Sequence, residues 1–471
     1  MSCYILNPSI ALRSWRLVPY AYYINGVRDA KGLKKDEFEF LSKCDGETEL
    51  EENSPLTRKF LDMGFVREAK EGDTLSEWQK PLACDNRYFP AMEYAITGKC
   101  NYNCLHCFNA ADNEPLMSEW TLDEAKKMLE QAQKCGLNAI TITGGEPMLH
   151  KYFFEIIEEI YKRGMYIGEI NTNGYFIDQA ALDRLKAIGC CPIIKISFDG
   201  IGHHDWLRNR EGAEENAISA FRLCKENGFD VWAQTNVHMR NIDTMLTTAK
   251  MLDEMGVDEM RIIRTSESPR WKENAGDARN PGGACLGIDE YYDRMFKFAA
   301  EYIKEPHKMD IDIWQFLMIF PSNRAFRVRP VECGEGEYRD SLPVCRGTRG
   351  KIAVAANGNV YPCLQLSGFY DAHGEFLGNI KKDGLQPLLQ SGKYLGEVCT
   401  TVKTLAENNF KCADCKYFRY CVGGCRALAY ALTNDKLGCD PAKCAFFKKD
   451  WYKRITALFD GWDNLAPMWI E

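Results

Sequence analysis

The sequence lacks long hydrophobic runs. No stretch of about 18 consecutive apolar residues occurs in its 471 positions, so no transmembrane-helix pattern is present. The first apolar segment is interrupted by Asn7, Pro8, Arg13 and Arg16, which does not fit a secretory signal. The chain also has no excess of positive charge. Its formal net charge of −8 argues against a nucleic-acid binder that neutralises phosphates.

Internal repeats and low-complexity segments are absent as well. Hydrophobic residues make up 45% of the chain and charged residues 27%, which indicates a globular protein of several domains. Cysteine, by contrast, is abundant. The 21 cysteines are odd in number and follow no export signal, so they do not indicate a disulfide framework.

The cysteines are unevenly distributed. Ten of them lie between Cys333 and Cys444, many in short-spaced pairs of the kind that metal or cluster ligation requires. We interpret eight others as small buried hydrophobic residues: Cys3, Cys44, Cys84, Cys135, Cys190, Cys191, Cys224 and Cys285.

The middle of the chain alternates between two patterns. Strand-type runs occur at 91–97, 138–143, 165–171, 192–198, 230–237 and 259–264. Helical patterns follow them at 121–135, 150–163, 178–188, 213–227, 242–255 and 288–305. This order predicts an α/β fold with a partial (βα)6 TIM-like barrel, whose chemistry belongs at the C-terminal ends of the strands.

The regions on either side differ from the barrel. Residues 1–85 predict a winged-helix-like module, with strands at 21–27 and 65–69 and helices at 34–42 and 54–63. The acidic segment 47–52 makes DNA binding the weaker interpretation and peptide docking the better one; a plain packing domain is the alternative. We expect the barrel at 86–310, a bridging segment and loop-rich cysteine domain at 311–446, and a C-terminal helix at 447–471.

A cysteine triplet follows the first barrel strand. Cys100, Cys104 and Cys107 have C-x3-C-x2-C spacing. Three thiolates on one tight loop can hold three irons of a [4Fe–4S] cluster and leave the fourth iron open for a ligand. Zinc is the rival, with His106 as an awkwardly spaced fourth ligand.

Polar residues follow the next strands. Gly144 and Gly145 allow a close backbone approach, and Glu146 places a carboxylate at the same rim as the triplet. The third strand ends in 171–174 (NTNG), and the fourth strand supplies Ser197 and Asp199. Ordinary strand-to-helix turns are the alternative explanation for these last two segments.

The triplet, the GGEP segment and the strand-end polar residues together resemble the radical S-adenosylmethionine (radical SAM) superfamily, across about 91–305. The resemblance implies that Cys100, Cys104 and Cys107 bind the cluster and that S-adenosylmethionine binds its open iron and yields a 5′-deoxyadenosyl radical. It further implies that the segment from Gly144 to Glu146 contacts the methionine amino group. The resemblance also implies cofactor contacts by Ser197, Asp199 and Arg208. Arg208 would contact the cofactor carboxylate; the alternative for this residue is a plain surface salt bridge.

The second group of cysteines resembles the SPASM auxiliary-cluster domain, over about 333–444. The resemblance implies two further [4Fe–4S] clusters, three in all. The first would be held by Cys345, Cys363 and Cys425, with Cys333, weakly Cys399, or an open iron as its fourth position. The second would be held by Cys412, Cys415, Cys421 and a last cysteine, for which Cys444 is preferred over Cys439. Zinc at the C-x2-C pair is the rival.

A SPASM domain behind an N-terminal module resembles the maturases of ribosomally made peptides. We therefore expect a leader peptide bound by residues 1–85, an oxidative thioether or carbon–carbon cross-link, an electron donor such as flavodoxin or ferredoxin, and a cytoplasmic setting. The alternatives are a peptide epimerase, a formylglycine-forming sulfatase-maturating enzyme, and a non-enzymatic iron–sulfur carrier or redox regulator. His238, Glu267 and Asp199 are candidates for a general base, but none can be assigned.

Overall fold

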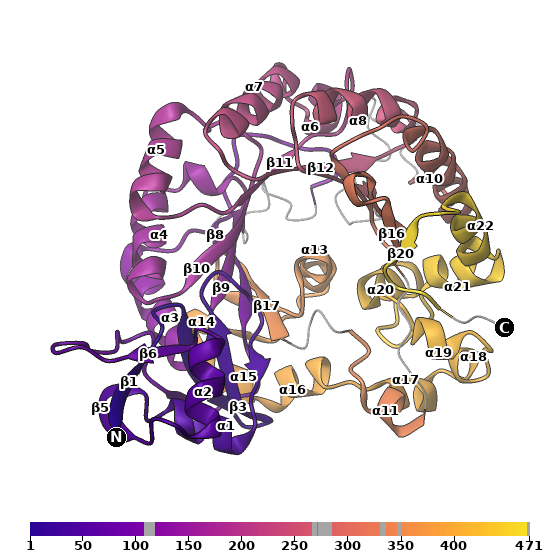
Figure 1. Ribbon diagram of the computed structural model, residues 1–471. Helices are drawn as coiled ribbons and strands as arrows, with labels where there is room; N and C mark the ends of the chain where they lie inside the picture. The colour runs from indigo at the N-terminus through magenta and orange to yellow at the C-terminus, as the bar shows by residue number, and fades with distance from the viewer. Residues whose placement is uncertain (108–117, 266–270, 272–284, 330–335, 346–349, 469–471) are drawn as a thin grey trace.

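The computed structural model describes residues 1–107, 118–265, 271, 285–329, 336–345 and 350–468. Figure 1 shows an outer arc of helices around a curved sheet, with the C-terminal region completing a ring. None of the helices in the described ranges is long and apolar enough to cross a membrane.

Six parallel strands form the barrel in chain order, as the sequence predicts. They are β8 (Ala91–Thr97), β9 (Ala139–Gly144), β10 (Tyr166–Thr172), β11 (Ile193–Ser197), β12 (Val231–Val237) and β13 (Glu259–Arg264). The helices between and after them lie on the outside of the sheet (Figure 1). These helices are α3 (Leu122–Lys134), α4 (Phe153–Lys162), α5 (Gln179–Ile188), α6 (His204–Arg208), α7 (Ala213–Glu226), α8 (Met245–Glu254) and α10 (Ile288–Tyr302).

The sheet continues beyond the six predicted strands. A parallel strand is added at each edge: β17 (Lys351–Val354) beside β8 and β14 (Asp310–Ile313) beside β13. Further strands, each antiparallel to its inner neighbour except β20, which is parallel to β16, extend the sheet to a described order of β19-β18-β17-β8-β9-β10-β11-β12-β13-β14-β15-β16-β20. The added strands are β15 (Leu317–Phe320), β16 (Ala325–Val328), β18 (Asn359–Tyr361), β19 (Gly378–Asn379) and β20 (Asp463–Asn464).

The two faces of the barrel sheet are buried to different extents. On β12, Val231, Ala233, Thr235 and Val237 are buried, whereas the alternating residues are partly exposed. The outward residues of the strands pack under the helices in one large apolar core. Because side chains alternate across a strand, the partly exposed set faces the barrel interior. Among the described residues, that interior is therefore partly open to solvent and lacks the packed apolar layers that fill a closed TIM barrel.

The N-terminal region contains the predicted helices, α1 (Lys35–Leu41) and α2 (Pro55–Asp62), and two small sheets. The first sheet is antiparallel, in the order β5 (Asp45–Leu50), β1 (Ser2–Leu6) and β6 (Val66–Glu68). The second has the order β4 (Lys31–Gly32), β3 (Val18–Ile24), β2 (Ile10–Trp15) and β7 (Leu82–Cys84). Most of the acidic segment at 47–52 thus lies in an edge strand, β5.

The second small sheet is fixed to the barrel by hydrogen bonds. Trp15 Nε1 donates to the Cys135 carbonyl at 3.1 Å, and Tyr23 Oη donates to the Gly136 carbonyl at 2.9 Å. Asn138 Nδ2 donates to the Val27 carbonyl at 2.7 Å. Because Gly136 and Asn138 precede β9, this region docks at the N-terminal end of the barrel strands, opposite the cysteine triplet.

The C-terminal region contains more helix than its loop-rich composition predicts. Its short helices are α11 (Gly336–Ser341), α13 (Leu364–Ala372), α14 (Ile380–Asp383), α15 (Leu385–Gln390), α16 (Gly392–Val398), α17 (Val402–Asn408), α18 (Phe410–Ala413), α19 (Phe418–Cys421), α20 (Arg426–Thr433), α21 (Pro441–Lys448) and α22 (Trp451–Leu458). Several of these helices are only four residues long, which is too short for helical periodicity to be recognised in the sequence.

Candidate active site

The three cysteines of the first motif lie together on the loop after β8. Cys100, Cys104 and Cys107 form a small cluster with Tyr102 and Ala213. The Tyr102 amide donates to Cys100 Sγ at 3.4 Å. Burial raises the pKa of Cys100 to about 12 and that of Cys104 to about 11. Buried thiolates are stable only beside positive charge, so Cys100 and Cys104, with Cys107 on the same loop, fit the irons of a cluster.

Gly144 and Gly145 allow the cysteine loop to pass directly over the end of β9. The Gly145 amide donates to the Thr97 carbonyl and the Glu146 amide to the Lys99 carbonyl, both at 2.8 Å. A Cβ on Gly145 would lie 2.2 Å from the Lys99 oxygen, and one on Gly144 would lie 2.4 Å from the Thr97 oxygen. Both glycines also line a cavity of about 30 Å³ that extends to β17 and α13.

The Glu146 side chain is turned into the protein. It is fully buried, and its carboxylate accepts hydrogen bonds from the Met148 amide at 3.1 Å, the Thr172 hydroxyl at 2.9 Å and the Asn173 amide at 2.7 Å. Burial raises the pKa of Glu146 to about 7, although these hydrogen bonds act in the opposite direction. The carboxylate therefore joins the ends of β9 and β10, and only the backbone of this segment is left to contact a ligand.

Asn173 connects the end of β10 to the cysteine loop. Its Nδ2 lies 2.8 Å from Asn101 Oδ1 and 3.9 Å from Cys100 Sγ. The sequence marked 171–174 only as a polar strand end. The tertiary contact identifies Asn173 as the residue of that segment that reaches the triplet.

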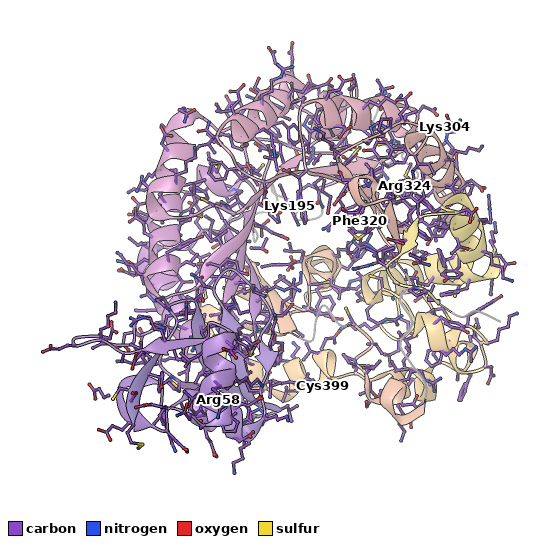
Figure 2. All side chains as sticks on the ribbon, viewed as in Figure 1. Arg58, Lys195, Lys304, Phe320, Arg324 and Cys399 are labelled. Carbon is purple, nitrogen blue, oxygen red and sulfur yellow. The ribbon has the colours of Figure 1, made fainter. Side chains whose placement is uncertain are left out.

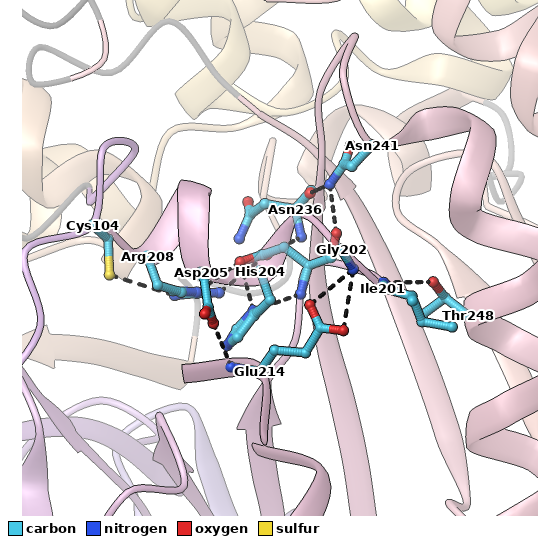
Figure 3. A network of polar contacts seen from close by, with 11 residues as sticks. Cys104, Ile201, Gly202, His204, Asp205, Arg208, Glu214, Asn236, Asn241 and Thr248 are labelled. Atoms are coloured by element: carbon cyan, nitrogen blue, oxygen red, sulfur yellow. Dashed lines mark hydrogen bonds and ion pairs between the residues drawn. The ribbon is translucent and has the colours of Figure 1, made fainter. Parts of the chain in front are cut away.

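Asp199 and Arg208 form a buried ion pair, and Figure 3 shows Arg208 directed toward Cys104. Arg208 Nε lies 2.6 Å from one Asp199 oxygen and Nη2 lies 3.1 Å from the other, while Nη1 lies 3.9 Å from Cys104 Sγ. Ser197 ends β11 and is partly exposed on the inner face of the barrel. Asp199 and Arg208 are thus paired with each other, whereas Ser197 has no charged partner in the described part of the chain.

Charged residues line the barrel interior between these strand ends and the docked N-terminal region. Lys195, placed on the inner face of the sheet in Figure 2, lies 2.9 Å from Glu169. Asp312 pairs with Arg261 at 2.8 Å and with Arg329 at 2.6 Å. The interior is therefore polar, with charges of both signs. Sequence periodicity gave no sign of it, because alternation along a strand does not show which face of the sheet the helices cover.

The cysteines predicted for the first auxiliary cluster approach one another. The charges of Cys425 and Cys345 both contribute to the raised pKa of Cys363, after burial, which is the largest cause. Cys333 lies outside the described residues. Cys399 is elsewhere: its sulfur lies 2.7 Å from Arg87 Nη1, which does not favour the weak prediction that it is a ligand.

The cysteines predicted for the second auxiliary cluster also gather, and Cys439 joins them. Cys439 Sγ lies 3.5 Å from Cys412 Sγ. Burial is the largest cause of the raised pKa of Cys412, followed by Cys439 and then by the charges of Cys421 and Cys444. Burial also raises the pKa of Cys444, and the charge of Cys415 contributes to that increase. In the described part of the chain, no three Cys, His, Asp or Glu side chains converge closely enough to bind a single metal ion. A cluster differs from such a site because each thiolate binds a different iron.

Lys443 was missed by the sequence reasoning. It is buried, and burial lowers its pKa to about 8 against the opposing charges of Asp440, Cys421 and Cys425. It thus places an ammonium group near one predicted ligand of each auxiliary cluster. Its position in the 440–444 segment (DPAKC) was the available signal, but only the fold brings it to both cysteines.

The candidate general bases are not supported by their surroundings. His238 is buried against two aromatic rings, 5.4 Å from Trp206 and 4.8 Å from Trp271 between ring centroids. Asp199 is held by Arg208. Glu267 lies outside the described residues.

Comparisons with known proteins agree with this arrangement. Residues 94–252 match the radical SAM superfamily, and residues 345–416 match SPASM, the iron–sulfur cluster-binding domain. An AdoMet-dependent heme synthase of Methanosarcina barkeri is 25% identical over 355 residues, 74% of this chain and 95% of that protein. A PqqA peptide cyclase of Granulibacter bethesdensis is 27% identical over 357 residues, 74% of this chain and 85% of that protein.

Solved structures share the fold. Streptococcus suis SuiB bound to precursor peptide SuiA superposes with a TM-score of 0.63 at 13% identity, covering 90% of this chain and 96% of that one. The structure of anSMEcpe with bound AdoMet and Cp18Cys peptide has a TM-score of 0.56 at 19% identity, covering 78% of this chain and 98% of that one. Since 90% of this chain is more than residues 86–471 contain, the match to SuiB includes part of the N-terminal region.

Proposed function

We propose that this chain, a radical SAM enzyme with a SPASM domain, matures a ribosomally made precursor peptide by installing an oxidative cross-link, either thioether or carbon–carbon. S-adenosylmethionine on the triplet cluster would supply the 5′-deoxyadenosyl radical. The radical takes one hydrogen atom from the peptide. Formation of the new bond then releases a proton and an electron, and we propose that an auxiliary cluster accepts this electron.

The observation that carries the proposal is the N-terminal region. It is a folded unit fixed at the N-terminal end of the barrel strands, and it belongs in part to the fold shared with SuiB. We propose that residues 1–85 are a winged-helix-like module that binds a leader peptide. A core peptide attached to that leader would enter the barrel interior from the same end. The match to anSMEcpe, by comparison, is short enough to lie wholly after residue 85.

The barrel interior supports a polar, extended substrate. Several of its partly exposed residues have hydrogen-bonding or charged side chains, such as Gln234, Asn236 and Glu169. A peptide backbone needs such partners when it leaves water. Among the described residues the charged pairs carry both signs, so these side chains provide no concentrated field for a ligand with several charges of one sign.

The cofactor proposal assigns three [4Fe–4S] clusters. Cys100, Cys104 and Cys107 would bind the first. Cys345, Cys363 and Cys425 would bind the second, with Cys333 or an open iron in the fourth position. Cys412, Cys415, Cys421 and Cys444 would bind the third. An external donor such as a flavodoxin or ferredoxin would supply the reducing electron. The proposed domain boundaries are 1–85, 86–310, 311–446 and 447–471.

Porphyrin chemistry is the second candidate, because curated relatives that match this chain over most of their length include an AdoMet-dependent heme synthase. Peptide epimerisation and formylglycine formation are further alternatives within radical SAM chemistry. All of them predict cleavage of S-adenosylmethionine, so that activity alone does not separate them. The modified product does.

The test is the intact mass of a short peptide encoded beside this gene, co-expressed anaerobically with the wild-type enzyme or with Cys104→Ala. Loss of two hydrogens with wild type alone establishes an oxidative cross-link, and fragmentation then separates thioether from carbon–carbon. An unchanged mass in ordinary water with deuterium uptake from heavy water indicates epimerisation instead. No change in either solvent, together with turnover of an added porphyrin, would overturn the peptide assignment.

A further inference from the structure

We propose that Arg208 is a positioning residue for the triplet cluster: its buried guanidinium donates to the Cys104 sulfur and thereby sets the reduction potential of the cluster. This role differs from the cofactor-carboxylate contact that the sequence pattern suggested. It depends on the radical SAM assignment and not on the identity of the substrate.

Each nitrogen of the guanidinium has one partner on the protein side. Nε and Nη2 contact the two oxygens of Asp199 at 2.6 and 3.1 Å, and Nη1 faces Cys104 Sγ at 3.9 Å. Arg208 is 7% exposed and Asp199 is fully buried. Each of the three guanidinium nitrogens thus already has a partner in the chain, which leaves this group poorly placed to bind a cofactor carboxylate.

Asp199 is itself held rigidly, so the direction of the guanidinium is fixed. The Asn236 amide donates to Asp199 Oδ1 at 2.9 Å, and the Asp199 amide donates to His204 Nδ1 at 3.0 Å. Asn241 Nδ2 donates to the Asp199 carbonyl at 2.7 Å. Figure 3 shows His204, Asn236 and Asn241 gathered from separate segments of the chain in the same network as Arg208. A planar fork bound at two points cannot rotate away from the sulfur.

The segment that carries Arg208 is fixed by a second set of contacts. Asp205 accepts hydrogen bonds from the Gly212 amide at 2.8 Å and the Glu214 amide at 2.7 Å, which joins α6 to the start of α7. Glu214 in turn accepts from the Gly202 amide at 2.8 Å. Arg208 is therefore held between the end of β11 and the cysteine loop by contacts on both sides.

The physical consequence concerns the added electron. Reduction increases the negative charge on a thiolate-bound cluster, and a buried N–H donor at a ligand sulfur stabilises that charge. Asp199 acts in the opposite sense, because a buried carboxylate close to the cluster repels the same electron. The two members of the pair should therefore shift the reduction potential in opposite directions.

The test uses the full chain with its clusters reconstituted anaerobically. We would titrate wild type, Arg208→Lys, Arg208→Gln, Asp199→Asn and Arg208→Gln/Asp199→Asn with a reductant and follow the signals by EPR. The triplet cluster is identified by the change in its signal when S-adenosylmethionine is added. We expect Arg208→Gln to lower the midpoint potential and Asp199→Asn to raise it. The double variant should fall between the two, and Arg208→Lys should stay nearest to wild type.

Binding of S-adenosylmethionine, measured by calorimetry on the same samples, separates this role from a cofactor contact. We expect Arg208→Gln to change the affinity by less than about threefold. An unchanged potential with an affinity loss of about tenfold or more would overturn the proposal in favour of carboxylate binding. Potentials that shift in the same direction in both single variants would also overturn it. Arg184→Gln, at a surface pair with Glu155 and Glu158, is the matched control and should change neither quantity.

If Arg208→Gln fails to retain its cluster, Arg208→Lys and Asp199→Asn still decide the question. Lysine keeps the charge but cannot bind both Asp199 oxygens and the sulfur at once. We then expect a small decrease of the midpoint potential in Arg208→Lys and an increase of the midpoint potential in Asp199→Asn. Absence of both shifts would contradict the proposal.

Discussion

The Glu146 carboxylate accepts a hydrogen bond from the backbone amide of Asn173 at 2.7 Å, across the ends of two neighbouring barrel strands. Asn173 in turn reaches Cys100 through its side chain. Glu146, the acidic residue of the GGEP segment, thus stabilises the cysteine loop through Asn173. Its contribution to the site is the fixed spacing between β9, β10 and the triplet.

We predict that Glu146→Gln destabilises the protein and lowers occupancy of the triplet cluster. The carboxylate accepts from three donors, and an amide nitrogen in its place would face at least one N–H or O–H group. Leaving such a buried donor unsatisfied costs about 1–3 kcal/mol. Denaturant unfolding and iron analysis measure both effects. Glu158→Gln, on the surface of α4, is the control, and equal behaviour of the two variants would contradict the supporting role.

A second prediction concerns the close approach at Gly145. In Gly145→Ala the new Cβ would meet backbone oxygens of Lys99 and Gly98 at 2.2 and 2.6 Å, so the cysteine loop must move. We expect bound iron to fall by about four atoms per chain, one cluster, and cleavage of S-adenosylmethionine to be lost. Gly396→Ala in α16, where no atom lies within 4 Å of the added Cβ, should keep all its iron.

The last ligand of the second auxiliary cluster can be decided by paired substitutions. We expect Cys444→Ala to lose about one cluster's four irons and Cys439→Ala to keep them. Both sulfurs are near Cys412, so proximity does not choose between them. Iron content and Mössbauer spectra of the anaerobic proteins give the answer. The reverse result would exchange the two assignments.

The buried Glu259 predicts a pH-dependent stability. Burial raises its pKa to about 7, from an ordinary value of 4.5. The folded protein therefore binds this proton more tightly than the unfolded chain does, so the free energy of unfolding decreases as pH rises from about 4.5 to above 7. Removing the ionisable group should therefore raise the free energy of unfolding above pH 7 by up to about 3 kcal/mol.

Glu259→Gln should accordingly be more stable than wild type at pH 8 and similar to it at pH 5, by denaturant unfolding of the same preparation. Glu254→Gln, at an exposed position of the preceding helix, is the control and should follow wild type at both pH values. A stability difference that does not grow with pH would show that Glu259 is ionised throughout, held by Arg261 at 3.6 Å.

Several features could be predicted from the sequence because they depend on local order along the chain. The triplet after β8, the alternation of six strands and helices, and the helices of residues 1–85 are of this kind. Apolar periodicity, glycines at helix ends and cysteine spacing are properties of neighbouring residues, and their physical causes are equally local. The auxiliary cysteines were recognisable for the same reason, from their spacing.

The tertiary structure decided what long-range contacts determine. Contacts between residues of different strands or helices determine three features of the site. They decide whether Glu146 faces a ligand or the protein, which partner Arg208 contacts, and whether Cys439 lies beside Cys412. The polar barrel interior has the same origin, because the direction in which a strand residue faces is set by which face of the sheet the helices cover. The sequence alone determined which chemical groups the protein carries, and the fold decided which of them meet, because burial and opposing strands fix those distances.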